Sequence, residues 1–387
     1  MYLGKWEEKA LQGEFGEALQ LSMNVLVKVC RALKAEKLVE ISHAHVSGVS
    51  YFNIGDEGIE FLEDLVKKGA KTSIYTTANP ASIAFLDKFR DSYSAEIIVK
   101  QRKIIDILIS IGIDRKSFTC IPYKLKTPVL GEHLAWAESS AVIYANSILG
   151  AKTNREGGVT ALMAAIAGRT CFSGMHLDEN RCPTETIVID FPIRSIAEAS
   201  AIGLYIGNVV RGIPYIKMKM YIDEKLKNVV LRSFLASLAS TSSCPLVLIE
   251  GVSPEAQKYV DKHSSLEKIS IDFKDVQTFF DSMCSPVLYL GCPHIDIDEL
   301  ELILRNSIEV LKILKIEKLY VSVPMYEQEK ILKYIGSLEG IEIVYLPGAC
   351  PVVSDLKNLK AVSTVHGKAR HYIPKTAGAS ACLVDIA

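Results

Sequence analysis

The chain has 387 residues, with 44 Lys and Arg against 45 Asp and Glu, and a formal net charge of −1. Hydrophobic residues make up 49% and charged residues 23%, which is an ordinary globular balance. This composition excludes a disordered chain, a collagen-like chain and a small disulfide scaffold, and the length favours about two or three folding units. The near-zero net charge gives no electrostatic reason to expect nucleic acid or an anionic membrane as the main partner.

The N-terminal residues and the cysteines predict a cytoplasmic protein. The first residues, MYLGKWEEK, lack the apolar core of a signal peptide, so we do not expect export. The longest uncharged run, 233–249, contains several Ser and Thr and one Pro, which makes it a poor membrane span. Nine cysteines without a secretory signal are expected to be cytosolic thiols, some of which can bind metal.

Short β-rich runs alternate with helical patterns along most of the chain. In chain order, strands are expected at 38–41, 72–76, 118–121, 186–191, 246–250, 268–271, 287–290, 319–323 and 341–346. Helices are expected at 58–68, 81–93, 141–149, 159–167, 196–210, 297–314 and 327–338. This alternation predicts an α/β fold of parallel or mixed sheets covered by helices, with strands buried on both faces.

Several packed subdomains around a central cleft are the predicted organisation. Five predicted strands repeat between 245 and 349 and resemble one α/β unit. Residues 125–174 are rich in Ala, Ser and Gly, which lets the backbone approach a ligand or another helix closely. Because no linker rich in Pro, Gly or charge separates the parts, the approximate subdomains are taken as 1–130, 131–243 and 244–387.

Three cysteines share a local context that points to a metal centre. Cys120, Cys292 and Cys350 each stand in or just after a predicted strand, next to Pro or Gly. Ligands bind at the carboxyl ends of strands in open α/β sheets, so the three thiols can converge there. Three thiolates do not complete a four-ligand site, which leaves a position for Lewis-acid chemistry on a hydroxy acid. The alternative is that each is a small buried packing residue.

The other cysteines have less favourable contexts. Cys182, in a polar loop, is a rival ligand, whereas Cys244 precedes its strand and so stands at the wrong end for this site. The rest are expected to be packing residues: Cys30, Cys171, Cys284 and Cys382.

Two loops that follow strands carry groups able to bind a substrate. Gly48, Val49 and Ser50 combine a glycine, a hydroxyl and free backbone N–H groups, as an anion cradle does. A plain strand-to-helix turn is the alternative. Asn79 and Pro80 follow the next strand, where Asn79 either caps a helix or presents its amide to a substrate.

Polar pairs precede two apolar predicted helices. Glu138 and Ser139 stand before the first, where a helix cap explains Ser139 and a hydrogen bond to substrate explains both. Asn154 and Arg155 stand before the second, and Arg suits two-point binding of a carboxylate or phosphate. The alternative for Arg155 is an ion pair at a surface turn.

The C-terminal stretch 366–375 is the most basic part of the chain. A substrate phosphate could bind there, to Lys375 first and to Arg370 second. The alternative is a solvated basic surface.

Four motifs in order resemble the large, catalytic subunit of aconitase X. They are HVSGVS at 45–50, TCIPY at 119–123, TNREGG at 153–158 and GCPH at 291–294. The likeness runs over nearly the whole chain, 1–387, and implies an aconitase-like catalytic core.

The resemblance also implies a cofactor and site residues. It implies that Cys120, Cys292 and Cys350 hold an iron–sulfur cluster, with [4Fe–4S] as the first expectation. A smaller iron centre is the alternative, because this chain lacks the Cys-x-x-Cys pair of ordinary aconitases. It further favours substrate contact for the loops at 48–50 and 79–80.

The activity implied is that of a hydro-lyase. The two-subunit archaeal form, which this chain most resembles, dehydrates (R)-5-phosphomevalonate to trans-anhydromevalonate 5-phosphate in a modified mevalonate pathway of isoprenoid synthesis. In that form the swivelling domain of aconitase is a separate small subunit, which is expected to supply a serine as catalytic base. We therefore expect a heteromer and assign no catalytic residue to this chain.

Other functions stay open at this point. The same scaffold is also similar to cis-3-hydroxy-L-proline dehydratase. The substrate of that enzyme has an amine and no phosphate. An iron-sensing or RNA-binding relative of aconitase is another class, against which the balanced charge and the missing basic patch argue. A zinc-stabilised scaffold is the third alternative.

Overall fold

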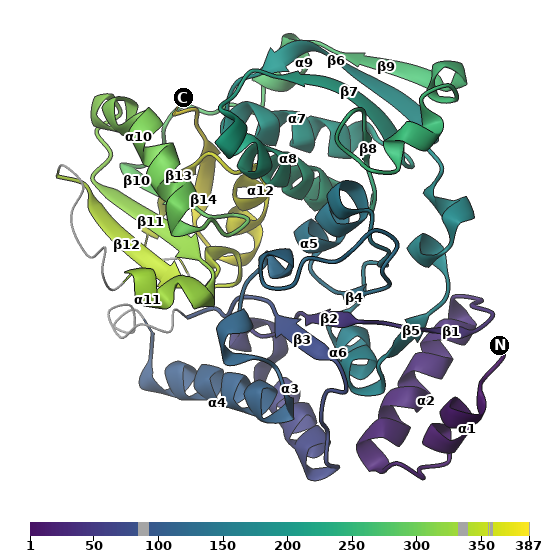
Figure 1. Cartoon of the computed structure of the whole chain (residues 1–387). Helices are drawn as coiled ribbons and strands as arrows, with labels where there is room; N and C mark the ends of the chain where they lie inside the picture. Colours follow the sequence, from purple (N-terminus) through teal and green to yellow (C-terminus); the bar gives the residue numbers. More distant parts are fainter. Residues whose placement is uncertain (84–92, 332–339, 355, 357–358, 387) are drawn as a thin grey trace.

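The protein is built from alternating helices and strands (Figure 1). The computed structural model describes residues 1–83, 93–331, 340–354, 356 and 359–386. The helices are α1 (Lys5–Leu11), α2 (Glu17–Ala32), α3 (Tyr51–Lys67), α4 (Ala95–Ile111), α5 (Ser139–Tyr144), α6 (Gly158–Ala167), α7 (Ile196–Val209), α8 (Lys227–Thr241), α9 (Phe273–Gln277), α10 (Ile297–Ile313), α11 (Gln328–Ile331) and α12 (Gly367–Thr376). The strands are β1 (Leu38–Glu40), β2 (His43–Val46), β3 (Tyr75–Ala78), β4 (Ala135–Trp136), β5 (Arg169–Cys171), β6 (Glu185–Ile193), β7 (Pro214–Met220), β8 (Leu248–Ile249), β9 (Glu267–Ile271), β10 (Val287–Leu290), β11 (Lys318–Val323), β12 (Glu342–Pro347), β13 (Ala361–Thr364) and β14 (Ser380–Leu383).

Parallel sheets organise the described residues, in the orders β3-β2-β4, β8-β7-β6-β9 and β12-β11-β10-β13-β14, with β1 and β5 forming an antiparallel pair. In Figure 1 the β6–β9 sheet lies at the top with α7 and α8 beneath it, the β10–β14 sheet lies on the left, and β2 and β3 lie below. Parallel neighbours need crossover connections, which α3, α7 and α10 supply between β2 and β3, β6 and β7, and β10 and β11. The predicted α/β class is confirmed.

The predicted elements agree with the structure best where the apolar runs are long. Helices α6, α7 and α10 and strands β6 and β8 to β12 lie where they are expected. The strand expected at 72–76 is displaced to β3, and the strand expected at 118–121 is reduced to one bridge between Phe118 and Ala78. The helix expected at 81–93 falls mainly outside the described residues, as does the one at 327–338 beyond α11.

The strands expected between 245 and 349 do not form one unit. Strands β8 and β9 pair with β7 and β6, whereas β10, β11 and β12 join β13 and β14 in a different sheet. Local patterns encode strand character but not which distant strand becomes the neighbour. The approximate subdomain bounds given above stay a prediction.

The serine-rich run after 233 is a buried helix, α8, which sequence analysis missed. The Ser237 hydroxyl donates to the Ser233 carbonyl (2.7 Å) and the Ser240 hydroxyl to the Ala236 carbonyl (2.7 Å), so the buried hydroxyls are satisfied within the helix. Helix α7 packs closely on α8, since a Cβ at Gly203 would lie 2.3 Å from the Phe234 carbonyl oxygen. This close approach fixes α8 beneath the β6–β9 sheet (Figure 1).

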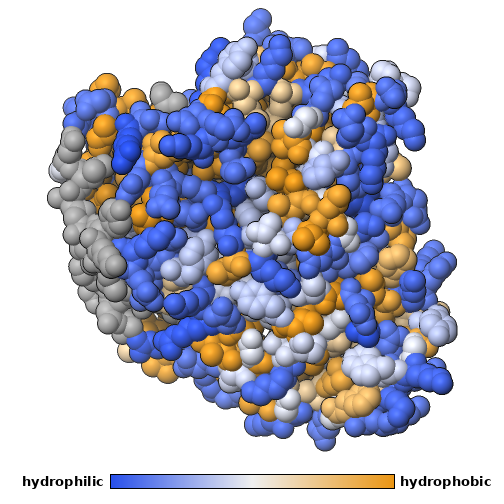
Figure 2. Space-filling model, in the orientation of Figure 1, coloured by the Kyte–Doolittle hydropathy of each residue, from blue (hydrophilic) through white to orange (hydrophobic). Residues whose placement is uncertain are grey.

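The molecular surface is mixed in character. On the face seen in Figure 2, polar residues predominate and apolar residues are exposed between them. None of the helices in the described ranges is long and apolar enough to cross a membrane.

The carboxyl edges of two sheets meet in the middle of the molecule. After β3, the Ala81 N–H donates to the Gly348 carbonyl (2.8 Å), and its own carbonyl accepts from the Cys350 N–H (3.0 Å) after β12. The Met325 N–H, after β11, donates to the Phe118 carbonyl (3.2 Å). The loops that follow β2, β3 and β4 therefore face the loops that follow β10, β12 and β13.

Two disulfides correct the expectation of free packing thiols. Cys30 of α2 is bonded to Cys171 of β5, and Cys284 is bonded to Cys382 of β14. The partners are 141 and 98 residues apart, so no local pattern could indicate them. Their Cα atoms lie 5.1 and 6.1 Å apart, within the range that a disulfide spans.

Replacing both Cys284 and Cys382 by Ala is expected to lower the free energy of unfolding by about 2–5 kcal/mol, because the bridge closes a loop across 98 residues. Thermal unfolding followed by circular dichroism, with and without a phosphine reductant, measures this. The control is Cys244→Ala, which removes a buried free thiol and should keep the sensitivity of the wild type to reductant. A double variant that melts at the wild-type temperature would contradict the prediction.

Candidate active site

The loop after β2 is held rigidly between other elements. Gly48 has a φ of +84°, in the left-handed region that favours glycine. The buried Ser50 donates its hydroxyl to the Val353 carbonyl (2.9 Å), near the end of β12. The Gln101 amide from α4 donates to the Val49 carbonyl (2.8 Å) and accepts from the Tyr51 N–H (2.9 Å). The backbone of 48–50 is therefore fixed before any ligand arrives.

A cavity of about 460 Å³ opens beside this loop. Its lining includes Ser47 to Ser50, Asn79 and Pro80, together with the first turns of α3 and α6 and apolar side chains of α3. Among the residues that the structure describes, no Lys, Arg, Asp or Glu side chain lines it. Gly158, at the start of α6, comes so close to the loop that a Cβ there would lie 2.8 Å from the Ser47 carbonyl oxygen. The cavity thus offers hydroxyls, amides and helix N-termini rather than charged side chains.

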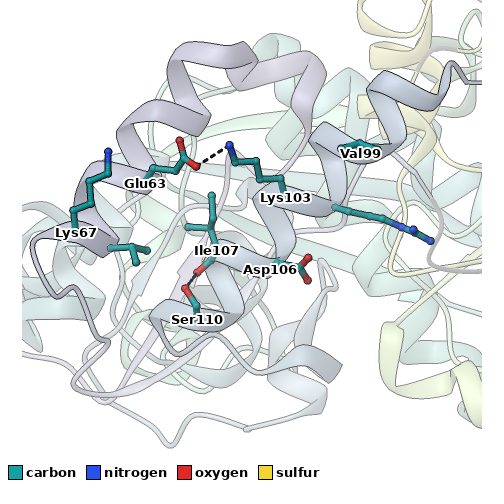
Figure 3. Close-up of a pocket in the computed structure, with 9 residues that line it drawn as sticks. Glu63, Lys67, Val99, Lys103, Asp106, Ile107 and Ser110 are labelled. Carbon is teal, nitrogen blue, oxygen red and sulfur yellow. Dashed lines mark hydrogen bonds and ion pairs between the residues drawn. The ribbon is translucent and has the colours of Figure 1, made fainter.

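A second hollow, of about 660 Å³, lies between α3 and α4 (Figure 3). Figure 3 shows that Lys103 reaches across it to Glu63 in an ion pair (2.7 Å), with Lys67 and Asp106 also on its walls. None of the site residues predicted from the sequence lines this hollow.

A buried ion pair lies where the two sheet edges meet. Glu138 follows β4 and caps α5, since its carboxylate accepts from the Ser140 N–H (3.2 Å). Lys368, in the first turn of α12 after β13, is only 8% exposed. Its amine donates a hydrogen bond to the Glu138 carboxylate, which belongs to the other sheet edge. The Lys368 amine also lies 3.4 Å from the Ser139 hydroxyl. The helix cap that the sequence suggested for Ser139 is thus provided by Glu138.

A chain of hydrogen bonds that begins at His43 ends at the Glu138 carboxylate. The carboxylate can only accept, so the Asn79 amide N–H₂ donates to it (2.9 Å) and the Asn79 Oδ1 faces His45 Nε2 (2.7 Å). His45 Nδ1 then accepts from the Thr77 hydroxyl (2.7 Å), which in turn accepts from His43 Nε2 (2.9 Å). The Ala44 carbonyl, 3.4 Å from the Thr77 oxygen, is a longer second acceptor for the Thr77 hydroxyl.

The protonation states agree with these directions. Burial lowers the pKa of His45 to about 4, so the ring is neutral at neutral pH. Burial opposes ionisation of Glu138, but the Lys368 ammonium and the Asn79 amide outweigh it and hold the pKa of Glu138 well below its usual range. Burial likewise opposes the charge on Lys368, and the Glu138 carboxylate raises the pKa of Lys368 above its usual value.

The structure brings the three predicted metal-binding cysteines into one neighbourhood beside this ion pair. Cys292 follows β10, Cys350 follows β12, and Cys120 follows the segment that bridges to β3. Burial raises the pKa of Cys120 to about 12 and that of Cys350 to about 11. The pKa of Cys292 is raised by burial first and then by the charges of Cys350 and Cys120.

These thiols fit an iron–sulfur group by the chemistry of the donor set. In the described part of the chain, no group of three or more His, Cys, Asp and Glu side chains is arranged to hold a single metal ion. A cluster differs from a single ion because its thiolates ligate different irons and need not crowd around one atom. The buried thiols are neutral by themselves, and a positively charged centre is what would stabilise them as thiolates.

The remaining predicted residues do not all reach this region. The Asn154 amide is used by the backbone, donating to the Ser173 carbonyl (3.1 Å) and accepting from the Met175 N–H (2.8 Å). Arg155 is exposed and makes only long hydrogen bonds, of 3.4 and 3.3 Å, to backbone carbonyls. Lys375 lies exposed at the far end of α12, where its amine contacts His371 (2.8 Å).

Arg370, the second phosphate candidate, is tied by two hydrogen bonds to Asp281, of 2.7 and 3.1 Å. Sequence analysis missed Lys368, His45 and His294, all buried at the meeting edges. The short run AVST at 361–364, followed by VHGK, was the signal for Lys368, because polar groups in the loop after a strand belong to the ligand-binding edge.

Replacing Lys368 by Met is expected to lower the free energy of unfolding by about 3–5 kcal/mol, because it leaves the Glu138 carboxylate buried without its cation. The double variant Lys368→Met/Glu138→Gln should recover part of this loss, which chemical denaturation of the wild type, both single variants and the double variant measures. Since the pKa of Glu138 is depressed on folding, its contribution is present above about pH 4.3 and lost as the pH falls through the folded value. Additive losses in the double variant would contradict the pairing.

Family models and relatives agree on what this chain resembles. The aconitase X first domain matches residues 1–179 and the aconitase X second domain matches residues 183–281. The phosphomevalonate dehydratase large subunit of Thermococcus kodakarensis is 36% identical over 400 residues, covering 100% of this chain and 98% of that protein. The same subunit of Methanocaldococcus jannaschii is 36% identical over 405 residues, with 100% and 98% covered.

A more distant relative has a different substrate. A cis-3-hydroxy-L-proline dehydratase of Hypocrea jecorina is 30% identical over 310 residues, covering 75% of this chain and 50% of that protein. Among solved structures, the crystal structure of Thermococcus kodakaraensis aconitase X in its holo-form has a TM-score of 0.88 and 36% identity, with 100% of this chain and 97% of that chain covered. The chain therefore belongs to the aconitase X family.

Proposed function

We propose that this chain is the large subunit of a phosphomevalonate dehydratase. The reaction is the removal of water from (R)-5-phosphomevalonate to give trans-anhydromevalonate 5-phosphate. Relatives of that name match the chain over its full length, whereas the hydroxyproline dehydratase matches three quarters of it. The observation that carries the proposal is the meeting of two buried thiols and one partly buried thiol with the Glu138–Lys368 pair, next to a cavity whose described lining side chains are uncharged.

Cys120, Cys292 and Cys350 would hold the iron–sulfur cluster. When bound, that group supplies Lewis acidity to a leaving hydroxyl. The residues of the chain itself hold the substrate in a fixed orientation. The charge of Lys368 acts on all three thiols, and the Ser139 hydroxyl lies beside its amine, so these two groups would orient the substrate carboxylate.

Glu138 and Asn79 keep that arrangement in place. Glu138 holds the Lys368 ammonium, and Asn79 joins the carboxylate to the chain of hydrogen bonds through His45. Positioning of this kind lowers the entropic part of the barrier, because the reacting groups are fixed before the substrate arrives. The exposed Arg155 could make a second contact to the substrate carboxylate. Asn154 accepts a hydrogen bond from the Met175 N–H and so holds the backbone next to Arg155.

The phosphate is proposed to occupy the cavity beside Gly48, Val49, Ser50 and Pro80. The first turns of α3 and α6 both line it, but in α3 the N–H groups of Tyr51, Asn53 and Ile54 already donate to Gln101 and Ser50. The N-terminus of α6, at Gly158 and Val159, is therefore the one that offers backbone N–H groups and partial positive charge to an anion. Since none of the described lining side chains is charged, the proposed partners of the phosphate are backbone N–H groups and hydroxyls. Lys375, at the far end of α12, is left out of this proposal.

A small subunit is the proposed partner. The full-length relatives are themselves named large subunits. We expect the partner to supply the serine that removes the proton from C2, and the whole to work as a heteromer.

The test is anaerobic co-production of this chain with a small subunit, followed by assays with 5-phosphomevalonate and with cis-3-hydroxy-L-proline. We expect turnover of the phosphorylated substrate alone, and iron and sulfide bound to the large subunit. Cys292→Ala should lose both the cluster and the activity. Turnover of hydroxyproline alone, or full activity of the variant without iron, would refute the proposal.

The phosphate position is tested separately by Gly158→Ala. The added methyl group collides with the Ser47 carbonyl and displaces the cradle, so the KM for 5-phosphomevalonate should rise roughly tenfold to a hundredfold. Val99→Ala, at an exposed position of α4 outside the lining of this cavity, is the control and should change KM by no more than about twofold. If Lys375→Met raises KM and Gly158→Ala does not, the phosphate binds at the C-terminal helix instead.

A further inference from the structure

His294 touches the loops of all three cysteines at once. It stands two residues after Cys292, and its side chain is fully buried, at 0% exposure. Its backbone N–H donates to the Cys120 Sγ (3.2 Å). One ring nitrogen, Nδ1, lies 3.2 Å from the hydroxyl of Thr119, next to Cys120, and the other, Nε2, lies 3.1 Å from the carbonyl of Ala349, next to Cys350.

The ring has one tautomer in this position. The Ala349 carbonyl only accepts, so His294 Nε2 carries the proton and donates to it. In the neutral ring Nδ1 is then an acceptor and takes the Thr119 hydroxyl proton. The Thr119 oxygen in turn accepts from the Ile121 N–H (3.2 Å), which directs its proton toward His294. The ring of His294 thus donates to the loop of Cys350 through Nε2 and accepts from the loop of Cys120 through Nδ1, and it connects these two loops.

Within the described ranges, no other side chain with a hydrogen bond at the meeting edges joins all three loops. His366 accepts from the Gly291 N–H (3.1 Å) and contacts the Ser233 hydroxyl (3.1 Å), so it connects α12 and α8 with the Cys292 loop alone. Ala81 joins the Cys350 loop to β3 through its backbone. Among these connections, only that of His294 spans Cys120, Cys292 and Cys350 together.

We propose that His294 is a positioning residue, which sets the relative placement of the three cysteine loops for the iron–sulfur group without binding it directly. This inference rests on the proposed function, because it takes the three thiols as the ligands of the cluster. Groups that orient metal ligands in this way typically change metal affinity 10–100-fold when they are removed. His294 is suited to the role because its ring bridges two partners that a shorter side chain could not reach together.

The experiment compares the rate at which an iron chelator removes the cluster from the anaerobically purified large subunit in complex with its small subunit. His294→Phe keeps the ring volume and removes both ring hydrogen bonds, so release should be roughly 10–100-fold faster. His294→Gln can still donate to the Ala349 carbonyl, and Thr119→Val removes only the Thr119 partner, so each should show a smaller increase. The loss of visible absorbance and the release of iron and sulfide are followed together, beside a thermal melt of each protein.

Two controls separate the outcomes. His263→Phe replaces another buried histidine, which stacks on Tyr215 far from the cysteines, and should leave cluster release unchanged even if it lowers the melting temperature. If His294→Phe and His263→Phe release iron at the same rate, the role of His294 is refuted while the cluster assignment stands. If Cys292→Ala keeps its full iron and sulfide, the proposed function itself fails. Should His294→Phe not fold, equal release rates for His294→Gln, Thr119→Val and wild type would overturn the inference.

Discussion

The site depends on one constraint, the junction between the carboxyl edges of two parallel sheets. Two backbone hydrogen bonds of Ala81, to Gly348 and Cys350, join the loop after β3 to the loop after β12. Backbone bonds of this kind are insensitive to which side chains surround them, so they fix the loops and leave the side chains free for chemistry. Residues as distant in sequence as Cys120, Cys292 and Lys368 become neighbours for this reason.

The charges at this junction explain why a cationic group belongs there. Glu138 is ionised and is matched by one ammonium, that of Lys368, so three additional thiolates would leave the buried site strongly negative. Burial raises the pKa of all three thiols and keeps them neutral by themselves. His45, His294 and His366 add no charge, because burial lowers the pKa of each ring and both ring nitrogens of each are hydrogen-bonded. The proposed iron–sulfur group would supply the positive charge that the described side chains do not.

Sequence patterns predicted the elements with long apolar runs and the groups that directly follow them. The cysteines after β10 and β12 were found because those strands are continuous runs of Val, Leu, Ile and Tyr. Lys368 was missed because β13 is short and polar, and α12 contains a proline, Pro374, which hid both elements. Charge density then favoured Lys375, although it stands at the opposite end of the same helix. Disulfide partners and neighbouring strands are far apart in the sequence, so the local spacing of apolar residues does not indicate them.

The proposed phosphate cavity and most of the proposed cluster ligands come from different sheets. This separation suggests how one fold accommodates different substrates. The cavity proposed for the phosphate is lined by residues of 46–162 and one residue after β12, Val353. Two of the three thiols, and Lys368, come from the other sheet. Changes in the loops after β2 and at the start of α6 can therefore alter the far end of the substrate while the thiols stay where they are. The hydroxyl that leaves is common to both kinds of dehydratase in this family, whereas the phosphate is not, so selection can act on the first sheet alone.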